Sequence, residues 1–338
     1  HYGLYEAWAK GGLGCAITGN VMVDIGAKNE PGVVAIETER DLEQLKHWAE
    51  IGKEYGMVQL VQLSHPGRQC PKGLNKETVA PSAVPFSPVL ATTFGTPREL
   101  REEEILDIIQ RFAYAAKICE KAGFEGIQLH GAHGYLISQF LSPLTNKRQD
   151  QWGGSIENRM RFLLEIYKAV RAGTSENFII SVKLNSADFQ RGGITEEDVI
   201  YVFKAIDAAG IDLIEISGGS YEAPAMAGVK EGKRKASTIA REAYFLDFAE
   251  RIRQEVKCYL MVTGGFRTVK GMNDALERGA CNFIGIARPF AGETDLTNHL
   301  IAGKDVRYGV EKIKNGIPMI DKIGIMEIIW YWAQFKTF

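Results

Sequence analysis

Phe178-Ile-Ile-Ser-Val-Lys-Leu184 is a short apolar run, and Leu213-Ile-Glu-Ile216 is a second run of the same kind further along the chain. Residues 195–209 lie between them with apolar side chains at helical spacing, and Thr195 with Asp198 is typical of a helix start. Neither run alternates apolar and polar residues, so both faces of each strand are expected to be covered. The segment therefore predicts a strand, a helix and a second, parallel strand.

The same alternation runs along most of the chain. Further strands are predicted at residues 14–20, 58–63, 126–129, 258–262 and 283–286. Further helices are predicted at residues 2–10, 41–55, 102–122, 156–172, 241–256 and 269–278. Because the chain begins with His1 and not Met, we expect one more strand before it, which makes eight. The sequence thus predicts an α/β protein, a (β/α)8 TIM barrel whose first strand is missing from this chain, with an open doubly wound sheet as the alternative.

The domain organisation is expected to be simple, since no linker or low-complexity tract interrupts the alternation. We predict one barrel domain over residues 1–338. Residues 65–97 are proline-rich and too long for an ordinary connection, so they are predicted to be an insertion that covers the mouth of the barrel. A helical extension is expected from about residue 310, where the aromatic residues 330–332 would serve packing or a homo-oligomer contact.

Composition and charge exclude several classes of function. The 338 residues include 40 basic and 42 acidic side chains, with a net charge of −2, which indicates no nucleic-acid surface and favours a small, weakly charged substrate. The longest apolar run, residues 323–332, contains Glu327 and is too short to cross a membrane. The five cysteines form no CxxC pair, so we expect reduced thiols, a cytoplasmic location and neither zinc nor an iron–sulfur cluster.

The clearest chemical signal follows the strand at 126–129, in the order His130-Gly-Ala-His133-Gly-Tyr135. This turn can direct two imidazoles and a phenol into one cavity. Two N–H donors on a conjugated carbonyl oxygen would stabilise the enolate charge left when hydride adds at the β carbon, and a phenol could then supply a proton. The alternatives are half of a metal site, which lacks a third ligand at suitable spacing, and ordinary structural polar residues. We therefore predict no metal.

A phosphate site is predicted after the last two strands, from Gly264 and Gly265 in the first loop and Ala287 and Arg288 in the second. Glycine lets backbone N–H groups approach an anion, and arginine adds charged hydrogen bonds. Barrels commonly bind phosphate after strands seven and eight, although a Gly-Gly pair also serves plain turns. Neither a Walker loop nor a GxGxxG fingerprint is present in the sequence.

Two further residues matter if the ligand is a flavin. The amide of Gln62 matches the donor and acceptor edge of a pyrimidine ring, and the ammonium of Lys183 could stabilise negative charge on a reduced flavin. The alternatives are a buried glutamine bonded to backbone and a lysine paired with an acid such as Asp188. Residues 150–159 are interpreted as a structural helix start.

The run from His130 to Arg148, continued by Trp152-Gly-Gly-Ser and Glu157-Asn-Arg159, resembles the Old Yellow Enzyme family of FMN-dependent NAD(P)H oxidoreductases. The resemblance implies a barrel with non-covalent FMN, reduced by NADH or NADPH. It implies that His130 and His133 hydrogen-bond the substrate oxygen and that Tyr135 donates the proton. It also implies a set of cofactor contacts: Gly19, Gln62, Lys183, Gly264, Gly265, Ala287 and Arg288.

The expected function is therefore reduction of activated C=C bonds in small enones, by hydride transfer from the flavin and protonation by Tyr135. Two alternatives stay open at this point. One is a flavin-free barrel lyase or isomerase acting on a phosphorylated substrate, for which Lys183 and Glu215 are the candidate groups. The other is a non-catalytic flavin-binding homologue.

Overall fold

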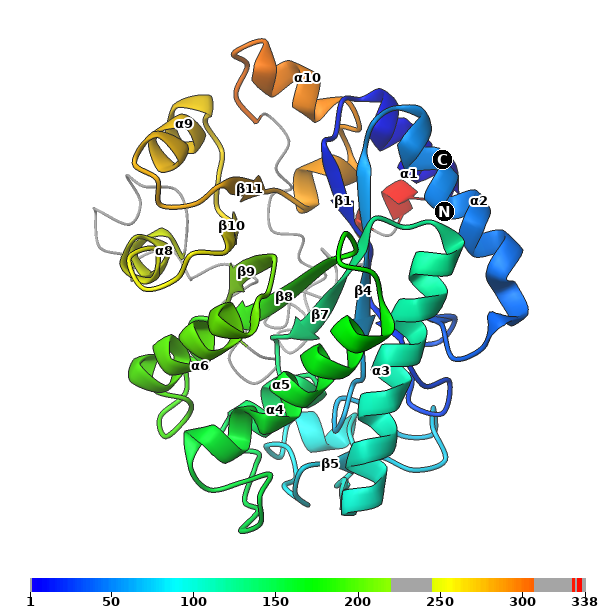
Figure 1. Ribbon diagram of the computed structural model, residues 1–338, viewed down its shortest axis with the longest axis vertical. Helices are drawn as coiled ribbons and strands as arrows, with labels where there is room; N and C mark the ends of the chain where they lie inside the picture. The colour runs from blue at the N-terminus through cyan, green and yellow to red at the C-terminus, as the bar shows by residue number, and fades with distance from the viewer. Residues whose placement is uncertain (1, 220–244, 307–329, 332, 336–338) are drawn as a thin grey trace.

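A computed structural model describes residues 2–219, 245–306, 330–331 and 333–335. A parallel sheet of nine strands forms its centre, with helices packed around the outside (Figure 1). All seven predicted strands are confirmed. They are β1 (Cys15–Ile17), β4 (Val58–Ser64), β7 (Gly126–Gly131), β8 (Ile179–Asn185), β9 (Leu213–Ser217), β10 (Tyr259–Thr263) and β11 (Phe283–Gly285).

These seven strands lie side by side in chain order, from β1 through β4, β7, β8, β9 and β10 to β11, and every pairing is parallel. Helices connect them on the outer side, which is the arrangement of a (β/α)8 barrel. Within the described ranges no ladder joins β11 to β1, so a closed eight-stranded barrel would hold one further strand between them. The fold is thus α/β and of the barrel class, as predicted.

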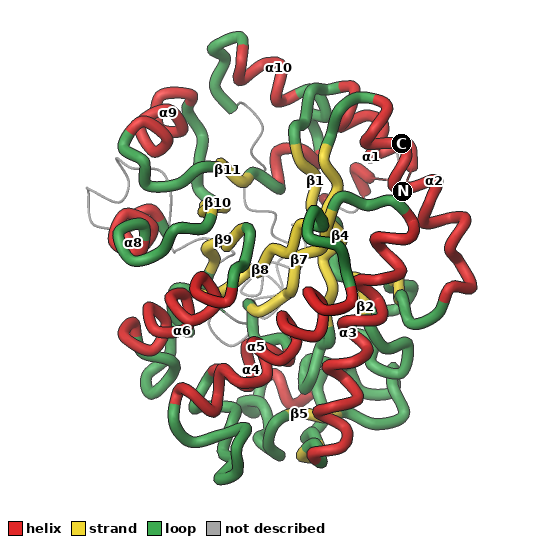
Figure 2. The backbone as a smooth tube through the Cα atoms, viewed as in Figure 1, coloured by secondary structure: helices red, strands yellow, loops and turns green. Residues whose placement is uncertain are grey.

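The predicted helices are found around the sheet, as the red segments of Figure 2 show. They are α1 (Tyr2–Lys10), α2 (Leu42–Glu54), α3 (Glu102–Ala122), α5 (Ile156–Gly173), α6 (Glu196–Ala209), α8 (Leu246–Ile252) and α9 (Val269–Glu277). The helix predicted at 241–256 ends earlier, at Ile252, and its first residues lie outside the described part. None of the described helices has the length and apolar character needed to cross a membrane.

Several short elements were not predicted, and four of them bear on the site or its surroundings. The strands β2 (Val21–Met22) and β3 (Val34–Ala35) are only two residues long, which is too short for a periodic pattern. The helix α4 (Leu136–Leu141) is buried along its whole length and therefore lacks a polar face, and α10 (Leu296–Ile301) is a single short segment. Because α4 starts directly after Tyr135, it fixes the end of the turn that carries the two histidines.

Packing between β7 and β8 is close enough to require glycine at one position. A Cβ added at Gly126 would lie 2.2 Å from the carbonyl oxygen of Ile179, and all six residues of β7 are buried. Outside the strands, Phe140 of α4 stacks on Phe162 of α5 with ring centroids 4.2 Å apart. The strand end that carries His130 is thus held by a dense apolar layer.

Residues 65–97 pack against the turn after β7. They contain β5 (Val79–Ala80), which pairs with β6 (Arg98–Glu99), and the 3-10 helix η2 (Leu90–Thr92). The backbone N–H of Leu136 donates to the carbonyl of His65. The boundaries of the single domain and the covering role of this insertion stay predictions. Most of the helical extension expected from about residue 310 lies outside the described residues.

The stretch at 150–159, interpreted from the sequence as a structural helix start, contributes to packing through Arg159. This arginine is 6% exposed, donates to the carbonyl oxygens of Gly154 and Leu141, and reaches Asp198 Oδ2 at 2.6 Å. The bonds join α5 to α4 and to the start of α6.

We expect Arg159→Met to lower the free energy of unfolding by about 3 kcal/mol, since it leaves buried partners without a donor. Lys168→Met on the same helix is the matched control. Its ammonium pairs with Glu165 at the surface, where such pairs contribute about 0–1 kcal/mol. Urea denaturation measures both changes, and equal small losses in the two variants would contradict the role given to Arg159.

Candidate active site

The two predicted histidines and the tyrosine form one contiguous group of rings. The ring centroid of His130 lies 5.2 Å from that of His133 and 4.6 Å from that of Tyr135, both in edge-to-face contact. His130 is still paired in β7, and Tyr135 is the N-cap of α4. The strand end and the helix start thus bring the three side chains together.

The turn between them contains strained backbone at His133, whose φ is +60°, a region that side chains other than glycine seldom adopt. Two side chains hold this peptide in place. Asn185 Oδ1 accepts from the N–H of His133 at 3.2 Å, and Gln69 Nε2 donates to its carbonyl at 3.0 Å. Strain of this kind persists where the surroundings fix it and is common at active sites.

His130 is a buried, neutral hydrogen-bond donor. Its burial and the nearby charge of Lys183 lower the pKa of His130 to about 3. Its Nδ1 accepts from the backbone N–H of Ala132 at 3.3 Å. The remaining proton therefore belongs on Nε2, which leaves an N–H directed away from the backbone.

His133 is also neutral, because burial, followed by the charges of Lys183 and His130, holds its pKa well below the usual range. Its Nε2 lies 2.7 Å from Ser217 Oγ at the end of β9. Sequence reasoning missed Ser217, because nothing in the local pattern indicates that β9 ends beside this ring.

Tyr135 is 4% exposed, and its hydroxyl oxygen accepts from two amides. Asn20 Nδ2 donates to it at 3.1 Å and Asn29 Nδ2 at 3.4 Å. Both asparagines come from the segment after β1 and were not predicted as site residues. Two donors on a phenol oxygen stabilise the phenolate that forms when the proton leaves.

His65, whose carbonyl oxygen accepts from the N–H of Leu136 next to Tyr135, is a buried histidine that makes stability depend on pH. Burial is the main cause that lowers the pKa of His65 to about 4, and Nδ1 accepts from the N–H of Gly67 at 3.1 Å. Because the folded pKa lies below the unfolded value of about 6.5, the stabilisation is complete above pH ~6.5 and is lost as the pH falls through about 4.

In this window the free energy of unfolding should fall by up to about 1.4 kcal/mol per pH unit for this histidine. The variant His65→Asn should therefore show a smaller dependence of the free energy of unfolding on pH. His47→Asn, at an exposed position of α2, should keep the dependence of the parent protein. Denaturant titrations from pH 7 to pH 4 test this, and identical slopes in the two variants would contradict it.

A cavity of about 240 Å³ opens at the carboxyl ends of β8 to β11, beside these rings. Six of the ten predicted site residues line it: His133, Lys183, Gly264, Gly265, Ala287 and Arg288. The other four are Gly19, Gln62, His130 and Tyr135. They are not in its lining, although His130 contacts the ring of His133, and Tyr135 is bonded to Asn20 next to Gly19.

The loops after β10 and β11 form the end of the cavity where a phosphate was predicted. Gly264 and Gly265 have φ values of +108° and +91°, which only glycine adopts without strain. Arg288 is exposed and, among the residues that the structure describes, forms neither a hydrogen bond nor an ion pair. An uncommitted guanidinium beside two glycines suits an anionic group.

Gln62 and Lys183 belong to one buried hydrogen-bonded chain. Gln62 Nε2 donates to Gln128 Oε1 at 2.7 Å, Gln128 Nε2 donates to Glu215 Oε2 at 2.8 Å, and Lys183 Nζ lies 2.9 Å from Glu215 Oε1. The expected alternatives for both residues therefore need correction. Gln62 is bonded to a side chain and not to backbone, and the acid that pairs with Lys183 is Glu215, whereas Asp188 accepts from Ser142.

The residues present fit an FMN molecule. A Cβ placed on Gly19 would meet no atom within 4 Å, so space is open above this part of the sheet. Gln62 and Lys183 would supply polar groups for its ring, and the glycine pair with Arg288 would hold its phosphate. Gly19 lies where β1 breaks off, and Thr18 Oγ1 accepts there from the backbone N–H of Gln62 at 2.9 Å.

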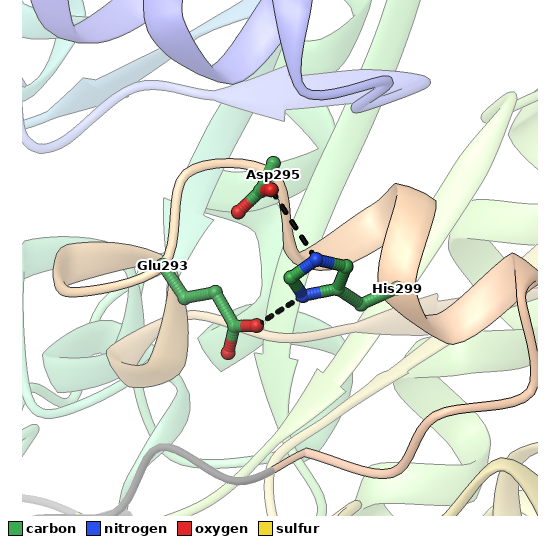
Figure 3. A group of neighbouring side chains, drawn as sticks. All are labelled: Glu293, Asp295 and His299. Atoms are coloured by element: carbon green, nitrogen blue, oxygen red, sulfur yellow. Dashed lines mark hydrogen bonds and ion pairs between the residues drawn. The ribbon is translucent and has the colours of Figure 1, made fainter.

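One group of possible metal ligands occurs in the described part of the chain, at Glu293, Asp295 and His299. Figure 3 shows His299 between the two carboxylates, with one ring nitrogen directed at each. Nδ1 lies 2.5 Å from Glu293 Oε1 and Nε2 lies 3.3 Å from Asp295 Oδ2. Because the two nitrogens serve different carboxylates, we interpret these contacts as joining α10 to the preceding turn. The absence of a metal stays a prediction.

The fold and the cavity together define a class: a barrel oxidoreductase with its site at the carboxyl ends of the strands. The chain belongs to the NADH:flavin oxidoreductase / NADH oxidase family, whose model matches residues 2–306. This family uses FMN, and the resemblance to Old Yellow Enzyme is confirmed. The protein is thus a flavin-dependent enzyme that takes electrons from NADH or NADPH.

Several known proteins are similar to the chain. The NADH-dependent flavin oxidoreductase iliE of Hypocrea jecorina is 38% identical over 99% of this chain and 89% of its own length. The NADH-dependent flavin oxidoreductase iccE of Talaromyces variabilis is 40% identical over 99% of this chain and 88% of its own length.

Solved structures show the same fold. A 2-naphthoyl-CoA reductase complex superposes with a TM-score of 0.80 and 29% identity, covering 90% of this chain but only 46% of the reductase. An Old Yellow Enzyme homologue from Zymomonas mobilis superposes with a TM-score of 0.75 and 24% identity, covering 92% of this chain and 84% of its own.

Proposed function

We propose that the protein reduces the activated C=C bond of small α,β-unsaturated carbonyl compounds with NADH or NADPH. The observation that carries this proposal is the contiguous group of His130, His133 and Tyr135 beside the cavity, in which both imidazoles are neutral. A neutral imidazole can donate an N–H hydrogen bond to a carbonyl oxygen. The phenol of Tyr135 is in contact with the ring of His130.

When bound, FMN supplies the two-electron chemistry that connects the nicotinamide to the β carbon of the alkene. The chain's own residues do the rest. The Nε2–H of His130 and the ring of His133 bind the carbonyl oxygen and stabilise its negative charge as the enolate forms. Tyr135 then gives its proton to the α carbon, and the amides of Asn20 and Asn29 stabilise the phenolate until solvent restores the proton.

The two other interpretations have less support. A Schiff-base lyase needs a lysine whose amine is free to attack a carbonyl, whereas Lys183 Nζ is held in an ion pair 2.9 Å from Glu215 Oε1. A non-catalytic homologue has no use for strained backbone at His133 or for two amides on the hydroxyl of Tyr135. We infer a small-molecule enone as partner, while the absence of nucleic-acid binding and a homo-oligomeric state stay predictions.

Anaerobic turnover of 2-cyclohexenone with NADH or NADPH tests the proposal. We expect one nicotinamide oxidised for each molecule of cyclohexanone formed, measured by absorbance and gas chromatography. Recovery of all the enone from protein whose FMN is reduced by the nicotinamide would contradict the proposed substrate class. FMN that is never reduced would support the non-catalytic homologue, and turnover of a phosphosugar without nicotinamide would support the lyase.

A further inference from the structure

The mechanism above assigns no step to Glu215, yet this buried carboxylate pairs with Lys183, which lines the cavity. Glu215 is 3% exposed and lies on β9 between β8 and β10. Burial raises the pKa of Glu215, but the charge of Lys183 and the hydrogen bonds of its neighbours, that of Lys183 first, outweigh it, so the pKa lies below its usual value. The group is therefore ionised, and each of its oxygens has a polar partner, Lys183 at Oε1 and Gln128 at Oε2.

An ionised carboxylate can only accept hydrogen bonds. This fixes the direction of each hydrogen bond in the series that links Glu215, Gln128 and Gln62. Gln128 must turn its NH2 group toward Glu215, so its oxygen faces Gln62. Gln62 must then turn its own NH2 group toward Gln128. The amide oxygen of Gln62 is left as an acceptor, and no hydrogen bond to it is found among the residues that the structure describes.

We propose that Glu215 is a positioning residue for FMN, acting through two groups at once. Its Oε1 holds the ammonium of Lys183, and its Oε2, through Gln128, turns the amide oxygen of Gln62 toward the ring of the cofactor. Its charge also balances that of Lys183, so Glu215 sets the relative affinity for oxidised and reduced FMN. The inference rests on the proposed cofactor contacts and does not depend on the alkene.

The sign of the effect follows from the charges. Reduced FMN carries negative charge on its pyrimidine side and is stabilised by a neighbouring cation. The Lys183–Glu215 pair is neutral as a whole, so removing the carboxylate leaves one uncompensated positive charge near the cavity. Binding of reduced FMN should then tighten relative to binding of oxidised FMN.

The test is Glu215→Gln in the full chain loaded with FMN, with the midpoint potential measured by equilibration with reference dyes. We expect the ratio of the affinity for reduced FMN to the affinity for oxidised FMN to rise about tenfold. For a two-electron couple this raises the midpoint potential by about 30 mV. Lys183→Met should move the potential in the opposite direction. Asp188→Asn is the matched control. This buried acid bonds Ser142 and is not part of the hydrogen-bonded series from Gln62 to Lys183.

A potential for Glu215→Gln within a few millivolts of the control, in protein that retains its far-ultraviolet circular dichroism, would overturn the inference. If that variant does not fold, Gln128→Met serves instead. It removes the hydrogen bonds that link Gln62 to Glu215 but keeps the Lys183–Glu215 ion pair. It should weaken FMN binding roughly fivefold by fluorescence titration. Unchanged affinity would equally overturn the inference. Neither readout uses an enone, so failure of the proposed reaction would leave this result standing.

Discussion

Replacing Tyr135 by Phe is expected to slow alkene reduction by about 10²–10⁴-fold while the reduction of FMN by NADH or NADPH stays nearly unchanged. Only the second half-reaction needs a proton at the α carbon, and we propose that the phenol supplies it. The variant keeps the ring that packs on His130 at 4.6 Å, so the geometry of the histidines is preserved. Stopped-flow absorbance resolves the two half-reactions.

A second buried tyrosine provides the control. Tyr167 lies in α5, is 4% exposed, and does not line the cavity. Tyr167→Phe should leave both half-reactions within about twofold of the parent protein. Equal slowing of both half-reactions in Tyr135→Phe would show that the tyrosine has a structural role and would remove it as the proton donor.

Arg288→Ala is expected to raise the dissociation constant of FMN by roughly 10- to 150-fold, which corresponds to about 1.5–3 kcal/mol for a hydrogen bond to a charged group. The guanidinium is exposed at the start of the 3-10 helix η4 (Arg288–Ala291) and has no ion pair in the described ranges. Its removal therefore leaves no partner unsatisfied, and the melting temperature of the FMN-free protein should not change.

Fluorescence titration of FMN measures this affinity. Arg278→Ala is the matched control, because that arginine is exposed, approaches Glu250 at 3.7 Å, and does not line the cavity. Its dissociation constant should stay within about twofold of the parent. An equally small effect in Arg288→Ala would place the phosphate of FMN elsewhere.

The fold could be predicted from the sequence because each long element carries its own periodic signal. The buried strands β7, β8 and β9 appear as apolar runs, and α3 and α6 show helical spacing along their whole length. Short elements such as α4 carry no such signal, because a helix buried on all sides has no polar face.

The site could be predicted where one local motif contains several of its residues. His130, His133 and Tyr135 lie within six positions, and Gly264 with Gly265 follows a strand directly. Contacts between strands could not be predicted, since they depend on register. Glu215 pairs with Lys183 because β8 and β9 align these residues. Asp188, named in the alternative interpretation as an acid that could pair with Lys183, lies beyond the end of β8, where it bonds Ser142.

Asn20, Asn29 and Ser217 were missed for the same reason. Each comes from a segment distant in the chain from the side chain it contacts, and asparagine and serine at strand ends are common without any catalytic role. Only the assembled barrel shows that two amides meet the hydroxyl of Tyr135 and that a serine faces His133.

An anaerobic absorbance spectrum of the FMN-loaded protein tests the central claim most directly. Addition of NADH or NADPH should bleach the flavin band, and later addition of 2-cyclohexenone should restore it as the enone is reduced. A flavin band that stays bleached with the enone and returns only when oxygen is admitted would contradict the assignment of His130, His133 and Tyr135 to alkene reduction.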